Sequence, residues 1–135
     1  MRILALDWGT VRIGGAISDP DGKIAFPLDK FIESKNAIPE IKQLVIEKEV
    51  EKILIGFPKS LSGTENNSTK NVQIFVKKLE KETICPIELI DERLSSQGAH
   101  KTLSNQGVST KKQRDLVDNL AAQQLLQTYL DTKNN

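Results

Sequence analysis

The stretch that decides the predicted fold is residues 2–18, RILALDWGTVRIGGAIS. It opens on a near-continuous apolar run, Arg2 to Leu6, which is typical of a strand buried on both faces. The loop that follows, Trp8 to Arg12, is too short for a helix, so the chain turns straight back into a second apolar run, Ile13 to Ser18. Two glycines in that second run indicate a close approach by another part of the chain.

A strong turn signal, Asp19-Pro20-Asp21-Gly22, separates the second run from a third, Lys23 to Leu28. Proline and glycine stand there at positions that turns favour. Because all the links are short, we predict that the fold begins with a meander of three antiparallel strands.

Beyond residue 35 the pattern changes to helices that alternate with strands. The expected helices share apolar residues at helical spacing and cover residues 38–45, 72–79 and 110–132. Asn36 is a candidate cap of the first helix, and a capping-box pair starts the last one. The other expected elements are strands at Lys52 to Phe57 and Ile87 to Ile90 and a short helix at 99–103. This order predicts one α/β domain over residues 1–135, with a five-stranded mixed sheet and helices on both faces.

Composition restricts the classes of function. The chain has 135 residues, 38% hydrophobic and 27% charged, which suits one globular domain. The net charge of +1 excludes a strongly basic nucleic-acid coat, so any polyanion-binding surface must be local. The single cysteine, Cys85, excludes an internal disulfide and a cysteine-based zinc site. No apolar run approaches the roughly 18 residues of a membrane span, so we expect a cytoplasmic protein.

Carboxylates follow two of the predicted strands. Asp7 ends the most apolar strand, where an ionised side chain is costly to bury unless it meets a partner or a metal ion. Bonds from the amides of Gly9 and Thr10 are the structural alternative. Asp91 and Glu92 follow the fifth strand, and strand alternation gives them opposite faces without deciding which one points at Asp7.

A further acid, Asp118, stands in the predicted last helix. The residues that share its face are small or apolar: Ala121, Ala122, Leu125 and Tyr129. Such a face packs closely against a sheet, so the acid requires a partner. A salt bridge with Arg93 or Arg114 is the structural alternative to a functional role.

These acids are expected to meet, because ligands collect at the carboxyl ends of strands in open α/β sheets. Carboxylate oxygens without histidine or cysteine favour Mg²⁺ or Mn²⁺. Two such ions about 3.5–4 Å apart support phosphodiester cleavage. The residues alone therefore predict a metal-dependent nuclease or another phosphoryl-transfer enzyme. Trp8, beside Asp7, is expected to pack in the core rather than stack on a base.

Two segments supply local positive charge. Residues 56–65, GFPKSLSGTE, lead from a strand into a helix whose amino terminus suits a phosphate. Residues 93–114 carry five basic residues and no acid, which suits a nucleic-acid backbone. The predicted nucleic-acid contacts are Lys59, Arg93, Lys111, Lys112 and Arg114. A plain connector and a solvated surface are the alternative interpretations of the two segments.

Three motifs in this order resemble the YqgF/RuvX family over almost the whole chain. They are LDWGTVRIGGAISD at residues 6–19, DERLS at 91–95 and RDLVDNLAA at 114–122. The family's middle loop resembles residues 56–65, with Phe57 in place of its usual leucine and Ser62 where an acid is common. The resemblance implies a ribonuclease H-like fold, Asp7, Glu92 (or Asp91) and Asp118 as catalytic and metal-binding acids, and Mg²⁺ or Mn²⁺ as cofactor.

The same resemblance implies a nuclease that trims the 5′ side of the 16S rRNA precursor, in contact with ribosomal precursor particles, as a monomer or weak homodimer. One alternative is a Holliday junction resolvase, which would act on branched DNA as a symmetric dimer. Another is a nucleic-acid-binding module without catalysis. Asp7-Trp8-Gly9-Thr10 also resembles the phosphate loop of actin-like ATPases, but 135 residues do not supply the two domains that those enzymes need.

Overall fold

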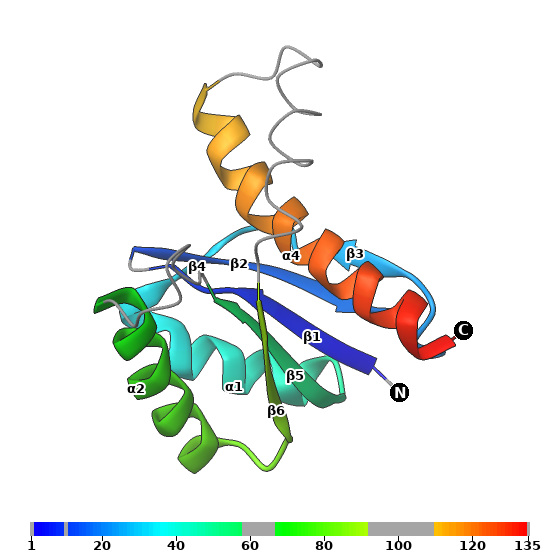
Figure 1. Ribbon diagram of the computed structural model, residues 1–135, viewed down its shortest axis with the longest axis horizontal. Helices are drawn as coiled ribbons and strands as arrows, with labels where there is room; N and C mark the ends of the chain where they lie inside the picture. The colour runs from blue at the N-terminus through cyan, green and yellow to red at the C-terminus, as the bar shows by residue number, and fades with distance from the viewer. Residues whose placement is uncertain (1, 10, 58–66, 92–109, 135) are drawn as a thin grey trace.

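The computed structural model describes residues 2–9, 11–57, 67–91 and 110–134, in which a mixed sheet is covered by helices on both faces (Figure 1). The elements in chain order are β1 (Arg2–Asp7), β2 (Arg12–Ser18), β3 (Ala25–Pro27), β4 (Ile32–Glu33), the 3-10 turn η1 (Ser34–Asn36), α1 (Ala37–Glu47), β5 (Val50–Phe57), α2 (Asn67–Glu82), β6 (Ile87–Asp91) and α4 (Thr110–Asn134). None of the described helices is long and apolar enough to cross a membrane.

The strands follow the order β3-β2-β1-β5-β6, and β4 pairs with β2. β1 is antiparallel to β2 and parallel to β5, which in turn is parallel to β6. The predicted meander and the predicted mixed sheet are therefore confirmed. Because β1, β5 and β6 run in the same direction, their carboxyl ends lie at one edge of the sheet.

Some local predictions were wrong. The third strand begins at Ala25 rather than Lys23, because the carboxylate of Asp19 accepts hydrogen bonds from the amides of Lys23 (2.7 Å) and Ile24 (3.0 Å) and keeps them in the turn. A sixth strand, β4, has only two residues, too few to produce a hydrophobic period. Asn36 occupies the N-cap position of α1, but its side chain makes no capping bond. The predicted short helix at 99–103 lies outside the described residues.

Two buried clusters fill the space on either side of the sheet. Leu4 and Leu6 of β1 pack in the cluster beneath α1 and α2. Ile3 and Ala5 pack in the other, which includes Leu126 of α4. Side chains that alternate along a strand point to opposite faces. Odd-numbered positions of β1 therefore face α4, and even-numbered positions face α1 and α2.

Helix α4 runs antiparallel to β1 across its face of the sheet (Figure 1). Near its end, Tyr129 accepts a hydrogen bond from Lys52, which pairs with Ile3 at the start of β1. Ten residues earlier, Asn119 bonds to Gly15, the partner of Leu6 near the end of β1. The residues just before Asn119 therefore approach the carboxyl edge of the sheet.

Candidate functional site

Asp7 is the last residue of β1, and it lies at the carboxyl edge of the sheet. Its strand partners are Gly14 of β2 and Gly56 of β5. The side chain is half-buried. Because Ile3 and Ala5 belong to the cluster beneath α4, alternation along β1 gives Asp7 the same face. The first predicted acid thus stands on the α4 side of this edge.

The loop that follows Asp7 is held by backbone contacts. The amide of Trp8 donates to the carbonyl oxygen of Gly56 at 3.1 Å, which continues the pairing of β1 with β5 by one residue. The hydroxyl of Ser34 donates to the carbonyl oxygen of Gly9 at 2.7 Å. A Cβ at Gly9 would collide with the carbonyl oxygen of Arg12, so this tight turn requires glycine.

The structural alternative for Asp7 was a pair of hydrogen bonds from the amides of Gly9 and Thr10. Within the described part of the chain, the side-chain bond found at Gly9 is the one that its carbonyl oxygen accepts from Ser34, and none joins its amide to the carboxylate of Asp7. Thr10, the other donor considered, lies outside that part.

Asp118 enters the site through its position in α4. The residue that follows it, Asn119, is only 2% exposed and bonds to the backbone on both sides. Its side-chain oxygen accepts from the amide of Gly15 (2.9 Å), and its side-chain nitrogen donates to the carbonyl of Leu28 (2.8 Å). Gly15 directly follows Gly14, the partner of Asp7. The backbone of Asp118 is therefore brought to the end of β1 where Asp7 stands.

The predicted face around Asp118 is confirmed by its neighbours. Ala121, Ala122 and Leu125 are all buried, and Tyr129 is partly buried against the cluster beneath α4. The side chain of Asp118 lies outside the described part, as do Arg93 and the side chain of Arg114. The salt bridge proposed as an alternative stays a prediction.

Asp91 ends β6 at the same edge of the sheet. It pairs with Phe57, next to Gly56, the partner of Asp7. β5 lies between β1 and β6, so the backbones of Asp7 and Asp91 are two strand spacings apart, about 10 Å. Ile90 packs in the cluster beneath α4, and Ile87 packs in the opposite cluster. Glu92 lies outside the described residues.

The side chains of all five predicted basic contacts lie beyond the described part of the chain. Lys59 and Arg93 lie outside the described residues. Lys111, Lys112 and Arg114 are in the first turns of α4, which extend past the edge of the sheet (Figure 1). Among the described side chains, no group of three histidine, cysteine or acidic residues could hold a metal ion. Asp7 is the one predicted catalytic acid whose side chain is described.

A set of amide side chains on α4 was missed by the sequence analysis. Gln123 donates to the carbonyl of Ala25 (3.0 Å), and Gln127 accepts from the amide of Ala25 (2.9 Å) and donates to the carbonyl of Lys23 (3.0 Å). Together with Asn119 they stand at i, i+4 and i+8. That regular spacing of amides along a helix with an apolar face is the signal that could have revealed them.

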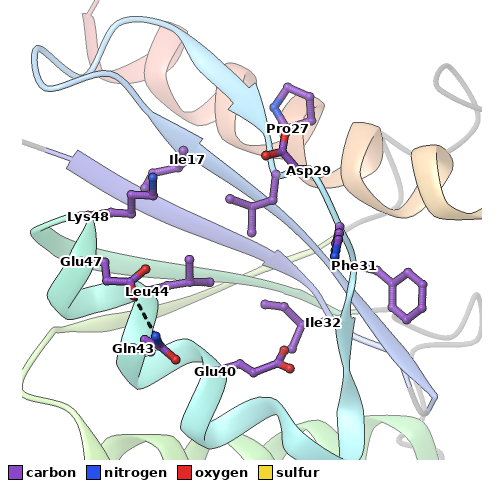
Figure 2. Close-up of a pocket in the computed structure, with 12 residues that line it drawn as sticks. Ile17, Pro27, Asp29, Phe31, Ile32, Glu40, Gln43, Leu44, Glu47 and Lys48 are labelled. Atoms are coloured by element: carbon purple, nitrogen blue, oxygen red, sulfur yellow. Dashed lines mark hydrogen bonds between the residues drawn. The ribbon is translucent and has the colours of Figure 1, made fainter.

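One hollow lies on the face of the sheet opposite Asp7. It measures about 840 Å³ and lies between α1 and the segment that joins β2 to β4 (Figure 2). Ile17 and Leu44 form part of its apolar lining. The charged residues that line it are three acids and two lysines: Asp29, Glu40, Glu47, Lys30 and Lys48. This excess of acid does not suit a polyanion.

Comparison with known proteins decides the family. The sequence model of the RuvX family, described as Holliday junction resolvase, matches residues 1–132. The chain belongs to the RuvX family. Curated relatives of this RuvX chain carry the name "Putative pre-16S rRNA nuclease". One from Listeria monocytogenes is 39% identical over 99% of the chain and 100% of its own length, and one from Natranaerobius thermophilus is 38% identical over 100% and 97%.

Solved structures show the fold of this RuvX chain. RuvC of Thermus thermophilus in complex with a Holliday junction substrate has a TM-score of 0.63 at 11% identity, covering 99% of this chain and 96% of that one. The fowlpox virus resolvase in complex with Holliday junction DNA has a TM-score of 0.58 at 12% identity, covering 100% of both chains. These RuvC-like neighbours confirm the predicted ribonuclease H-like architecture.

Proposed function

We propose that this RuvX chain is a metal-dependent nuclease that cleaves phosphodiester bonds in the precursor of 16S rRNA. The proposed catalytic and metal-binding residues are Asp7, Glu92 and Asp118. The observation that carries the proposal is the position of Asn119. It fixes α4 on Gly15, so that the backbone of Asp118 reaches the end of β1 on the face of the sheet that alternation gives to Asp7.

The packing of Ile90 supports Glu92 rather than Asp91 as the second acid. Ile90 belongs to the cluster beneath α4, the same cluster as Ile3 and Ala5. Residues two apart in a strand share a face, so continued alternation would give residue 92 the face of Asp7. Glu92 is therefore the second acid of the proposed site.

The donor set fits the proposed cofactor. Three carboxylates offer hard oxygen ligands, which Mg²⁺ and Mn²⁺ prefer. When bound, such ions activate a water molecule and stabilise the leaving oxygen. The chain's own part is to hold the acids at one edge of the sheet. The predicted basic residues Lys59, Arg93, Lys111, Lys112 and Arg114 would then bind the phosphates of the substrate.

The pre-16S substrate is proposed from the names of relatives that cover nearly the whole chain. We also propose the cytoplasm as location and ribosomal precursor particles as partners, since that substrate belongs there. The second candidate function is Holliday junction resolution, favoured by the description of the family and by the two solved relatives bound to junction DNA. It would require a symmetric dimer, whereas the rRNA activity is compatible with a monomer or weak homodimer.

The test compares three substrates with purified protein: a precursor 16S fragment, an unrelated single-stranded RNA and a four-way DNA junction, each with Mg²⁺, with Mn²⁺ and with EDTA. We expect cation-dependent cleavage that is fastest on the precursor fragment and is lost in both Asp7→Asn and Asp118→Asn. Unchanged cleavage in these variants would contradict the catalytic assignment. Preference for the junction, together with a dimer in sedimentation, would establish the resolvase instead.

A further inference from the structure

A groove of about 420 Å³ opens beside Trp8, the residue that follows Asp7. It lies between the start of α1 and the middle of α2, on the face of the sheet opposite α4. The lining residues that matter here are Trp8, Lys35, Asn71, Ile74, Phe75 and Lys78. We call this surface the Trp8 groove. Its volume falls in the range of roughly 300–1,000 Å³ that is typical of ligand sites.

The floor of the Trp8 groove is aromatic and apolar. Trp8 and Phe75 pack against the cluster beneath α1 and α2, as predicted for Trp8, but both rings are only partly buried and also line the groove. Ile74 is 53% exposed there. Two of the six aromatic residues of the chain thus border one hollow. The two rings are therefore open to a ligand that enters the groove.

The charge of the Trp8 groove selects an anionic ligand. Lys35 and Lys78 line it, and none of the lining residues within the described part of the chain is acidic. Lys35 is paired with Glu33 at 3.7 Å, but the two side chains are 80% and 51% exposed, so water screens this pair and a phosphate can replace it. Flat apolar rings beside cations match a nucleotide, whose base stacks while its phosphate pairs.

A second hollow continues the same surface past the loop after Asp7. It measures about 480 Å³ and also includes Lys35 and Glu33. The guanidinium of Arg12 lies 5.8 Å from the centroid of the Phe31 ring, and both residues line this hollow. Aromatic and basic groups therefore line two adjoining hollows near the Asp7 end of β1, and Glu33 is the acid that lines the second.

We propose that the Trp8 groove holds an unpaired base of a nucleic-acid strand that crosses the carboxyl edge of the sheet, on the face opposite Asp7. The base stacks on Trp8 and Phe75, and the adjoining phosphates pair with Lys35 and Lys78. A base inside a duplex is already stacked and paired, so only a single-stranded segment can enter. This inference rests on the proposed function and deepens it: the enzyme acts at or beside unpaired nucleotides.

Trp8 is the one tryptophan of the chain, so its fluorescence reports on this groove directly. Octamers of single-stranded RNA and DNA and a blunt RNA duplex are titrated into the full-length protein in EDTA, where no metal-dependent cleavage occurs. We expect saturable quenching by either single strand and none by the duplex. Equal quenching by the duplex, or binding of labelled single strands without quenching, would overturn the proposal.

Variants separate stacking from charge. Phe75→Leu keeps an apolar side chain in the core and should weaken single-strand binding by roughly tenfold, as loss of one stacked base does. Lys78→Ala should reduce the slope of log affinity against log salt by about 0.7, the value for one phosphate contact on a single strand. Lys77→Ala, an exposed neighbour on α2 that does not line the groove, is the matched control. Equal effects of Lys77→Ala and Lys78→Ala would contradict the assignment.

The binding and cleavage experiments test the groove and the proposed nuclease activity separately. Cleavage that depends on Asp7 but occurs without quenching of Trp8 would contradict the proposed role of the groove and leave the proposed nuclease activity intact. Quenching by single strands without cleavage in Mg²⁺ or Mn²⁺ would keep the groove and remove the proposed reaction.

Discussion

The side-chain oxygen of Asn119 accepts a hydrogen bond from the amide of Gly15 at 2.9 Å, joining residues 104 positions apart in the sequence. The nitrogen of the same side chain donates to the carbonyl of Leu28 at 2.8 Å. One buried amide therefore ties α4 to β2 and to the segment after β3. Because Gly15 adjoins the strand partner of Asp7, this contact also sets how far along β1 the helix reaches.

Replacement of Asn119 by alanine should lower the free energy of unfolding by about 2–4 kcal/mol. The amide of Gly15 and the carbonyl of Leu28 would lose their partner, and an unsatisfied buried polar group costs about 1–3 kcal/mol. Urea denaturation measures the change. Thr128→Ala, on the exposed side of α4, is the control and should change stability by less than about 0.5 kcal/mol. Equal stability of Asn119→Ala and the parent would show that water replaces the amide.

Asp7→Asn should reduce the rate of cleavage at least about a hundredfold, because Asp7 is a proposed ligand of metal ions whose stabilisation of charge would contribute several kcal/mol. The midpoint of thermal unfolding should stay the same or rise, since the substitution removes a half-buried charge. Single-turnover cleavage and calorimetry give the two values. Asp21→Asn, an exposed acid in the turn before β3, should change neither. A large loss of stability in Asp7→Asn would instead assign this residue a structural role.

Gly9→Ala should destabilise the protein more than Gly15→Ala. A Cβ at Gly9 meets the backbone carbonyl of Arg12, which moves only with the loop, whereas a Cβ at Gly15 meets the tip of the Leu28 side chain, which can rotate. Overpacking of this kind costs about 1–3 kcal/mol. Chemical denaturation ranks the two, and a larger effect at Gly15 would contradict the geometry. Gly9→Ala should also slow cleavage, because the loop it distorts follows Asp7.

The hydrogen bonds of Lys52 should make the stability of the protein depend on pH. Its ammonium group donates to the hydroxyl of Tyr129 (2.7 Å) and to Glu88 (2.9 Å), and these bonds, that of Tyr129 foremost, raise the pKa of Lys52 above its ordinary value of 10.5. A raised pKa means that the folded protein favours the charged form. The stabilisation is therefore complete below pH 10.5 and is lost as the pH rises through the raised value.

Lys52→Met should cost about 1 kcal/mol of unfolding free energy between pH 7 and 9, and the difference from the parent should shrink above pH 10.5. Urea denaturation across this range provides the measurement. Exposed Lys81→Met, on α2, serves as the control and should show a small difference that does not change with pH. A constant difference for Lys52→Met up to pH 12 would contradict the assignment.

The elements that could be predicted from the sequence are those with a strong local signal. The apolar run of β1, the return through Ile13 to Ser18 and the apolar spacing of α2 all correspond to observed elements. The edge position of Asp7 followed from its place at the end of β1, and the buried face of α4 followed from Ala121, Ala122 and Leu125.

The features that were missed depend on contacts between distant residues. β4 exists because Arg12 and Ile13 offer it a partner, and two residues carry no period of their own. In the sequence Asn119 has no feature that separates it from other polar residues of the helix, because its role depends on a hydrogen bond from the distant amide of Gly15. The choice between Asp91 and Glu92 depends on which cluster Ile90 joins, and that is a property of the packed sheet rather than of the strand.

Two glutamines of α4 have a consequence for folding during translation. Gln123 and Gln127 bond to Ala25, the first residue of β3, and Gln127 also bonds to Lys23 in the turn before it, on the side where no described strand pairs with β3. The sheet therefore gains its outermost bonds from residues synthesised about 100 positions later. During translation, these backbone groups of Lys23 and Ala25 cannot make their bonds to the glutamines until α4 has been synthesised. The proposed catalytic acid Asp118 lies on the same helix, so the segment that completes this border of the sheet also supplies the backbone of that acid.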